Sequence, residues 1–290
     1  MTDLFSLAKN LYRSQARFVF ELIQNAEDNQ YQRAKSDGIE PYIKFNIRPD
    51  MIFIDSNEDG FTRENVKAIC RIGGSTKTRA GSQQYIGEKG IGFKSVFMVA
   101  SRVRIQSGPF SFFFEHEPGD PGMGMITPEW ETSEDSLPGP ITRITLTLLK
   151  TLDYPDLLSQ FDALPDTLLL FLTKLGTIMV EKSGFPNEAS ESTSYSCNFD
   201  ERSRRATLRK VHCRGGEQLE TALKHYYIAR RLLSNLPWDE QRDYNSAEVI
   251  LAFPMDTESV PIIGRQEVYA YLPIRDFGFP VSIATSTASF

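Results

Sequence analysis

The sequence predicts an α/β fold, and two patterns support that class. Residues 18–29 (FVFELIQNAEDN) place apolar side chains on one side of a helix and polar side chains on the other. Several later segments, such as residues 141–148, alternate apolar and polar side chains as a strand with one buried face does. At 290 residues the chain is long enough for one large domain or two smaller ones.

Capping and turn residues bound most elements in the first half of the chain. Thr2 or Asp3 can cap a first helix, and Thr62 can cap a short later one. Turn signals at residues 36–38, 48–50 and 107–109 separate the strands around them. We therefore expect helices at 4–17, 18–29, 63–69 and 93–100, strands at 42–47, 51–54, 103–106, 110–116 and 141–148, and loops at 71–85 and 118–139.

The second half of the chain favours strands. Residues 156–164 and 165–174 predict two helices, and residues 177–180 predict a strand. Small polar residues at 183–196 predict a boundary, so we expect a first domain at residues 1–182 and a β-rich segment at residues 183–290. Within that segment we expect strands at 206–212, 249–253 and 268–272 and a helix at 217–233. The chain ends soon after FGFPVSI, which indicates the front part of a longer protein.

Composition and charge narrow the class of protein. The hydrophobic share of 40% and the charged share of 24% are those of a globular protein. A net charge of −6 argues against a general binder of nucleic acid or of anionic membranes. The most apolar run, residues 168–180, is short and contains Lys174, so we expect no membrane-spanning segment. The N-terminus has no basic-then-apolar leader, and we expect an intracellular protein, cytoplasmic or nuclear.

The cysteines and histidines show no metal-ligand spacing. No CxxC pair occurs, and the six residues are spread along the chain: Cys70, Cys197, Cys213, His116, His212 and His225. We therefore expect reduced thiols and no structural zinc.

Three polar features are candidates for a shared site. On a helix, Glu21, Asn25 and Asp28 fall within one narrow arc, which is either a solvated stripe or one wall of a ligand site. Asp55 ends a strand beside a glycine turn. The third feature is the loop GEKGIG at residues 87–92, which leads into an expected helix. Backbone N–H groups of such a loop can bind phosphate oxygens, although a plain turn is the alternative.

These side chains suit a nucleotide with a metal ion. Magnesium prefers oxygen ligands and keeps waters and phosphate oxygens, so Asn25 could supply one ligand. Glu21, one turn earlier, could deprotonate a water aimed at the terminal phosphate. A carboxylate such as Asp55 could accept a hydrogen bond from the exocyclic amine of adenine, where guanine has a carbonyl.

Three motifs in order resemble those of the GHKL ATPases: FELIQNAEDN, DSNEDGF and IGEKGIGFKS. That superfamily includes gyrase, the ninety-kilodalton heat-shock chaperones, histidine kinases and MutL. Within the superfamily, the sequence of these motifs is most similar to that of the sacsin and NO VEIN branch, as the segments AICRIGGSTKT and YLPIRDFGFP indicate. The resemblance implies a Bergerat-type α/β sandwich, which is a mixed, mostly antiparallel sheet with helices on one face, followed here by a β-rich, transducer-like or family-specific segment.

The resemblance also implies roles for the matched residues. Glu21 resembles the water-activating glutamate, Asn25 the magnesium ligand, and Asp28 an acidic position near the nucleotide. Asp55 resembles the adenine-reading aspartate, and residues 71–85 resemble part of a lid over ATP. The remaining matched positions would contact the nucleotide: Asn57, Gly60, Gly87, Lys89, Gly90, Ile91, Gly92, Phe93 and Thr142.

Three departures from the family pattern leave alternatives open. Gly60 follows Asp55 by five positions rather than four, so Ser56 or Asn57 could take the adenine contact. Ile141 stands where the chaperones usually have glycine. Many members complete the site with a basic residue of the next domain, and three residues could serve here: Lys210, Arg230 and Arg275.

The expected function is magnesium-dependent ATP binding with slow hydrolysis coupled to conformational change. The alternative is an interaction module that senses ATP or ADP without hydrolysing it. A histidine kinase domain is disfavoured, because no histidine lies in an evident phosphoacceptor helix. We expect a protein partner or client that the sequence does not identify, and the sequence does not indicate an oligomeric state.

Overall fold

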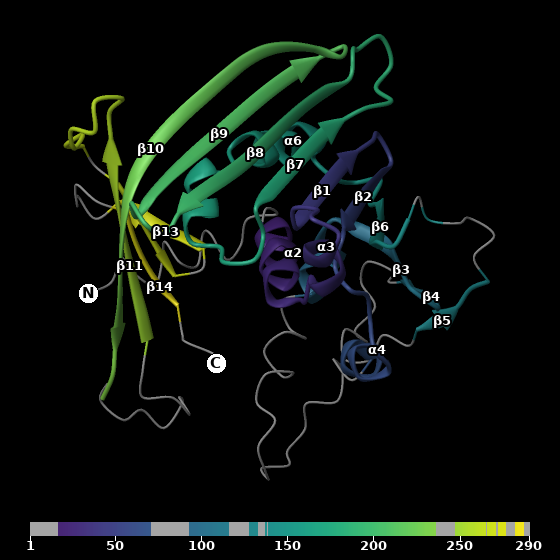
Figure 1. Ribbon diagram of the computed structural model, residues 1–290. Helices are drawn as coiled ribbons and strands as arrows, with labels where there is room; N and C mark the ends of the chain where they lie inside the picture. The colour runs from purple at the N-terminus through teal and green to yellow at the C-terminus, as the bar shows by residue number, and fades with distance from the viewer. Residues whose placement is uncertain are drawn as a thin grey trace, which may run out of the picture.

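One mixed β-sheet contains every strand in the described part of the chain (Figure 1). The computed structural model describes residues 17–70, 93–115, 128–132, 137, 139–235, 247–264, 266–270, 272–276 and 282–286. Its 14 described strands follow the order β13-β12-β14-β11-β10-β9-β8-β7-β1-β2-β6-β3-β4-β5. β1 pairs parallel with β7 and β12 with β14, and the other described pairs are antiparallel. The fold is therefore of the mixed α/β class, with more strand than helix, as the sequence predicts in outline.

The first half of the chain supplies the helix at the candidate site and one end of the sheet. Its elements are α2 (Arg17–Asp28), α3 (Gln32–Ser36), β1 (Tyr42–Ile47), β2 (Met51–Ser56), α4 (Arg63–Cys70), the 3₁₀ turn η2 (Lys94–Met98), β3 (Ala100–Ser107), β4 (Phe110–Glu115), β5 (Glu129–Trp130) and β6 (Thr142–Leu148). The second half contributes α6 (Tyr154–Asp162), the 3₁₀ turn η3 (Asp166–Leu170), β7 (Thr177–Lys182), β8 (Glu191–Asp200), β9 (Arg205–Arg214), β10 (Glu217–Leu233), β11 (Ala247–Met255), β12 (Glu267–Ala270), β13 (Leu272–Asp276) and β14 (Ser282–Ser286).

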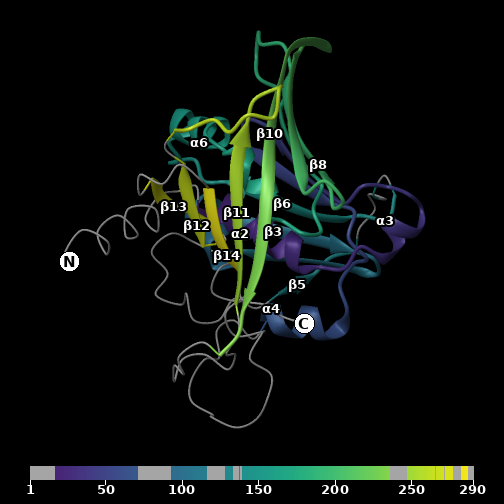
Figure 2. The same ribbon diagram turned by 60° about the vertical axis from the view of Figure 1, so that its left-hand side comes forward.

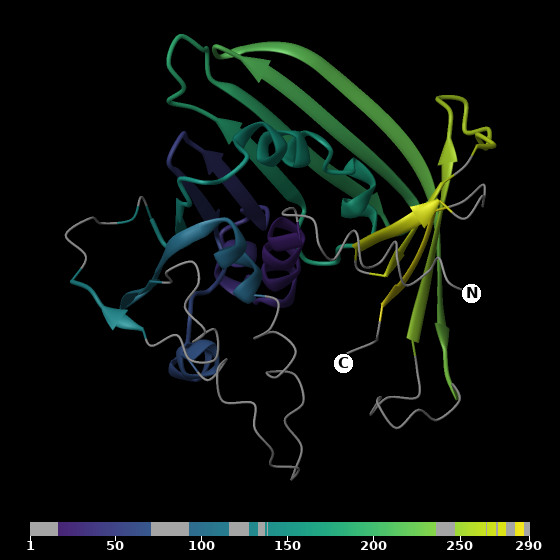
Figure 3. The ribbon, with the colours of Figure 1, turned by 180° about the vertical axis from the view of Figure 1, so that it is seen from behind.

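Two helices cover the same face of the sheet (Figure 3). The ring of Phe161 in α6 contacts Phe45 of β1 at 5.4 Å and Phe18 of α2 at 6.2 Å between centroids. Along α2, the apolar side chains Phe18, Val19, Leu22, Ile23 and Ala26 are all buried. The predicted amphipathic helix at residues 18–29 is therefore confirmed, and its apolar side faces the core.

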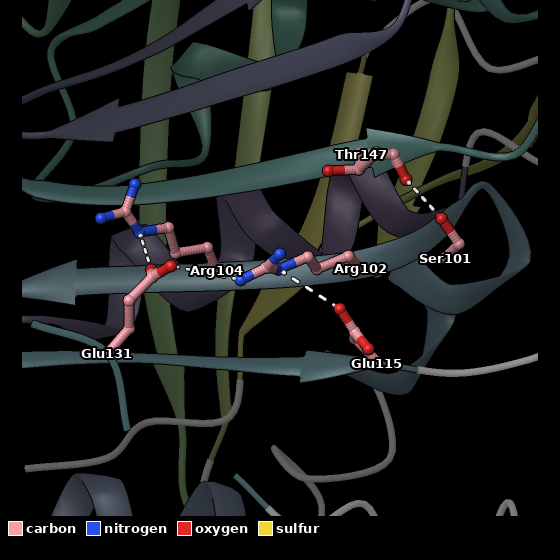
Figure 4. Close-up of polar contacts among 6 residues, drawn as sticks. All are labelled: Ser101, Arg102, Arg104, Glu115, Glu131 and Thr147. Carbon is pink, nitrogen blue, oxygen red and sulfur yellow. Dashed lines mark hydrogen bonds and ion pairs between the residues drawn. The ribbon is translucent and has the colours of Figure 1, made fainter. Parts of the chain in front are cut away.

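The opposite face of the sheet carries ion pairs near its β5 edge (Figure 4). Arg102 and Arg104 of β3 both contact Glu131, at 3.3 and 2.7 Å, and Arg102 also faces Glu115 of β4. Glu131 directly follows β5, so its ion pairs with β3 add to the pairing of this short strand with β4. The sequence predicts this segment as a loop.

One expected helix, at residues 217–233, is wrong: these residues form β10. Glu, Leu, Ala, Lys and Arg dominate this segment and favour a helix locally. However, β10 pairs along most of its length with β9 and over its last nine residues with β11 (Figure 2). Tyr226 and Ile228, two residues apart, are buried on one face of the strand. Long-range pairing therefore overrides the local preference.

Two further helices are shorter than expected. Within residues 93–100, Phe93 is helical and η2 follows it as far as Met98, because β3 already begins at Ala100 and pairs there with β6. Only η3 forms within residues 165–174. The backbone N–H groups of Thr173, Lys174 and Leu175 bond instead to the side chain of Glu27.

The sheet continues through the segment where the sequence predicts a boundary. β7 pairs with β8, which begins at Glu191 within the small polar residues 183–196. The expected helix at 4–17 and loop at 71–85 lie outside the described residues. No helix in the described part of the chain is both long and apolar enough to cross a membrane.

The start of α6 offers a test of local stability. The Asp153 side chain accepts a hydrogen bond from the N–H of Asp156 at 3.1 Å and caps the helix. Asp153→Ala is expected to lower the free energy of unfolding by about 1 kcal/mol. Urea unfolding measures this loss. Lys150→Ala, at an exposed turn residue, is the control, and an equal loss there would argue against the cap.

Candidate functional site

The polar side of α2 carries three of the predicted site residues. Glu21 and Asn25 are half-buried and Asp28 is exposed, all on the helix whose other side packs in the core. Asn25 makes no hydrogen bond with another described residue. Glu21 and Asn25 are one turn apart, which is about 6 Å along the axis. The half-buried Asn25 amide is therefore available to a ligand.

The predicted phosphate-binding loop lies mostly outside the described residues. Gly87, Lys89, Gly90, Ile91 and Gly92 all belong to that undescribed part, and their roles stay predictions. Phe93 is buried and immediately precedes η2, which lies against α2. The chain that leaves this loop is therefore close to the helix of Glu21 and Asn25.

Asp55 points away from α2. Its neighbours Ile54 and Ser56 are buried on the helix side of β2, so the pleat turns Asp55 to the opposite face. There Arg143 of β6 donates two hydrogen bonds to the carboxylate, at 2.6 and 2.7 Å. The structure thus does not bring Asp55 together with Glu21 and Asn25.

Asn57 and Gly60 shape the turn after β2. The Asn57 amide accepts from the N–H of Tyr42 at 2.8 Å and donates to the carbonyl of Glu40 at 3.0 Å. Both polar atoms of this side chain therefore hold the backbone. Gly60 has φ +93, a conformation that favours glycine, and it lies next to the Ser107 hydroxyl.

Glu58, which the sequence reasoning missed, is the buried carboxyl on the helix side. Its side chain is 3% exposed. Oε2 accepts a hydrogen bond from the Asn29 amide just beyond the end of α2, whereas Oε1 has no hydrogen-bond partner among the described residues. Burial raises the pKa of Glu58 to about 7; a hydrogen bond with Thr142 lowers the pKa, and the charge of Asp59 raises it.

Buried hydroxyl groups adjoin this carboxyl. The hydroxyls of Thr142 and Ser107 are 2.6 Å apart, and Ser107 Oγ accepts from the N–H of Phe61 at 2.8 Å. We call Asn29, Glu58, Ser107 and Thr142 the polar cluster. Thr142, predicted to lie at the adenine site, therefore adjoins a carboxyl, but that carboxyl belongs to Glu58 rather than Asp55.

The segment that carries Glu58 is fixed by α3. The Asp59 carboxylate accepts from the N–H groups of Gln32 and Arg33, at 2.8 and 3.0 Å. The Arg33 guanidinium donates to the carbonyls of Glu58 and Pro140, at 2.9 and 2.5 Å. A signal for Glu58 was present in the sequence, since the extra residue in DSNEDGF shifts the acidic position relative to the glycine.

Two of the three basic residues considered for completing the site contact aromatic rings of β8. Lys210 lies over the ring of Tyr195 at 5.4 Å, and Arg230 over that of Phe199 at 5.3 Å. The side chain of Arg275 lies outside what is described. Among the described residues, no group of three or more His, Cys, Asp or Glu side chains could hold a metal ion.

Two known proteins are similar to part of the chain. Over 122 residues it is 43% identical to Protein NO VEIN of Arabidopsis thaliana. This aligned region covers 42% of this chain and 4% of that protein. Over 121 residues it is 31% identical to the mitochondrial heat shock protein 75 kDa of Rattus norvegicus, covering 36% of this chain and 17% of that protein. The matches thus span a small part of each relative. No family model matches the chain.

Proposed function

We propose that this chain is a magnesium-dependent ATP-binding domain whose site lies between the polar side of α2 and the polar cluster. The Oε1 atom of Glu58, which has no hydrogen-bond partner among the described residues, carries the proposal. A buried acceptor without a partner is costly, and a ligand donor would remove that cost. The exocyclic amine of adenine is such a donor, whereas guanine presents a carbonyl there. Glu58, in place of Asp55, is then the residue that selects adenine.

The length of α2 suits an extended nucleotide. Asn29, which contacts Glu58, follows Glu21 by eight residues, or about 12 Å along the helix axis. A purine at the Asn29 end therefore places its phosphates toward Asn25 and Glu21. The Asn25 amide oxygen fits magnesium as one ligand among waters and phosphate oxygens.

The arrangement of the sheet also supports the proposal. A mixed, mostly antiparallel sheet with α2 and α6 on one face is compatible with the Bergerat-type fold that the motifs imply. The partial similarity to a heat shock protein points the same way. We further propose that bound ATP is hydrolysed slowly with Glu21 as the base, and that hydrolysis changes the conformation of a chaperone-like or regulatory protein.

Calorimetric titration with ATP, ADP and GTP, with and without magnesium, tests the proposal. ATP and ADP are expected to bind, GTP to bind at least tenfold more weakly, and magnesium to strengthen ATP binding. Equal affinity for ATP and GTP would contradict the role of Glu58. No binding of any nucleotide would contradict the function as a whole.

Asn25→Ala is expected to abolish the gain in ATP affinity that magnesium gives, because the variant lacks the amide oxygen. The same titration measures this change. Asn46→Ala is the matched control, since Asn46 is a half-buried amide of β1 that bonds to Ser183. An Asn25→Ala protein with an unchanged magnesium effect would exclude Asn25 as the ligand.

A further inference from the structure

The carboxylate of Glu27 binds three successive backbone N–H groups. Oε1 accepts from the N–H of Thr173 at 2.6 Å and of Lys174 at 3.0 Å, and Oε2 from that of Leu175 at 2.9 Å. The Thr173 hydroxyl also donates to Oε1 at 2.7 Å. Such charge-assisted hydrogen bonds are roughly twice as strong as neutral ones. A single side chain of α2 thus holds a segment about 146 positions later in the chain.

The side chain of Lys174 in turn binds the backbone at the end of α2. Its ammonium group donates to the carbonyls of Asp28 at 3.2 Å and Asn29 at 2.9 Å. A cation at the C-terminal end of a helix is also favoured by the helix dipole. The last turn of α2 is therefore held from both its side chain and its backbone.

Residues 173–177, which we call the clamp segment, are held on three sides. Beyond the contacts to α2, the N–H groups of Gly176 and Thr177 donate to the carbonyl of Pro41, at 3.0 and 3.2 Å. The carbonyl of Gly176 accepts from the N–H of Cys197 in β8 at 3.2 Å. The clamp segment therefore joins α2, the start of β1 and β8, and it leads directly into β7.

Glu27 does not share the polar side of α2 with the candidate site residues. It follows Asn25 by two positions, which is about 200° around the helix. Its carboxylate accepts hydrogen bonds from the clamp segment and does not face the ligand position proposed for Asn25. Any effect of Glu27 on a nucleotide therefore acts through the position of the helix.

We propose that Glu27 is a positioning residue: it fixes the last turn of α2, and with it Asn25 and Asn29, to the clamp segment, so that nucleotide binding and the order of this segment are coupled. The inference rests on the proposed ATP site. Because coupling between two sites is reciprocal, ATP orders the clamp segment, and loosening the clamp segment weakens ATP binding by the same factor.

Hydrogen exchange of the full chain with and without magnesium and ATP tests this coupling. In the wild type, ATP is expected to slow amide exchange at residues 173–175 by roughly 5- to 150-fold, the usual range of such coupling. In Glu27→Ala this slowing should disappear, and calorimetry should show a loss of ATP affinity within the same range. Glu27→Gln keeps one acceptor oxygen and should lie between the two.

Two comparisons separate positioning from general destabilisation. Glu181→Gln removes a carboxylate that pairs with Lys44 at 2.6 Å outside the clamp segment, and it should leave both readouts unchanged. ATP binding to the wild type without slower exchange at residues 173–175, or unchanged affinity in Glu27→Ala, would overturn the inference alone. A wild type that binds no nucleotide would overturn the proposed function and the inference together.

Discussion

Replacing Glu58 with glutamine is expected to remove a pH dependence of about 3 kcal/mol from the stability of the protein. Burial raises the pKa of this carboxyl from 4.5 to about 7. Between these values the folded chain keeps a proton that the unfolded chain has released. The contribution of the protonated Glu58 carboxyl to the free energy of unfolding is therefore complete below pH 4.5. It is lost as the pH rises to about 7, at roughly 1.4 kcal/mol per pH unit.

Glutamine has nearly the same shape and does not titrate in this range, so Glu58→Gln lacks this slope. Urea unfolding of both proteins between about pH 5 and 8 gives the difference in unfolding free energy at each pH. The wild type should lose stability relative to the variant up to about pH 7 and hold a constant difference above it. Glu64→Gln, at an exposed carboxylate of α4, is the control. Parallel pH profiles for the wild type and Glu58→Gln would show that Glu58 ionises as an ordinary exposed carboxyl.

Periodicity predicts the elements whose stability is mainly local in origin. The apolar positions of α2 recur at helical spacing, and β1 matches the expected strand at residues 42–47. The hairpin of β3 and β4 also turns where Ser107-Gly108-Pro109 indicates. In each of these cases the residues that decide the conformation lie within the segment itself.

The errors arise where distant residues decide the conformation. β10 is a strand because β9 and β11 pair with it, although its own sequence favours a helix. The helix expected at residues 165–174 stops early, and the N–H groups of residues 173–175 bond to Glu27. Neither outcome follows from local propensity, since long-range partners supply the deciding interactions.

The candidate site shows the same division. The arc of Glu21 and Asn25 depends only on helical geometry, and α2 provides it. Whether Asp55 or Glu58 faces α2 depends on the pleat of β2 and on the turn after it. Applied strictly, the alternation of β2 turns Asp55 to the face opposite Ile54. That Glu58 folds back to the helix side depends on Arg33 and Asp59, whose contacts the sequence does not reveal.

Replacing Glu21 with alanine is expected to slow ATP hydrolysis by about 100- to 10,000-fold while ATP affinity stays close to that of the wild type. Glu21 lies one turn before Asn25 on the polar side of α2 and is half-buried. In the proposed site, a carboxylate there could orient and deprotonate a water near the phosphates that Asn25 would help to hold through magnesium. Phosphate release measured beside calorimetric binding separates the loss of turnover from a loss of affinity.

The wild type and a control variant decide between hydrolysis and sensing. Glu181→Gln, a carboxylate outside the proposed site, should hydrolyse ATP at the wild-type rate. Unchanged hydrolysis in Glu21→Ala would remove Glu21 from the chemistry without affecting the binding site. ATP binding by the wild type with no phosphate release would favour the nucleotide-sensing module, because the roles proposed for Glu58 in adenine selection and for Asn25 in metal binding require no turnover.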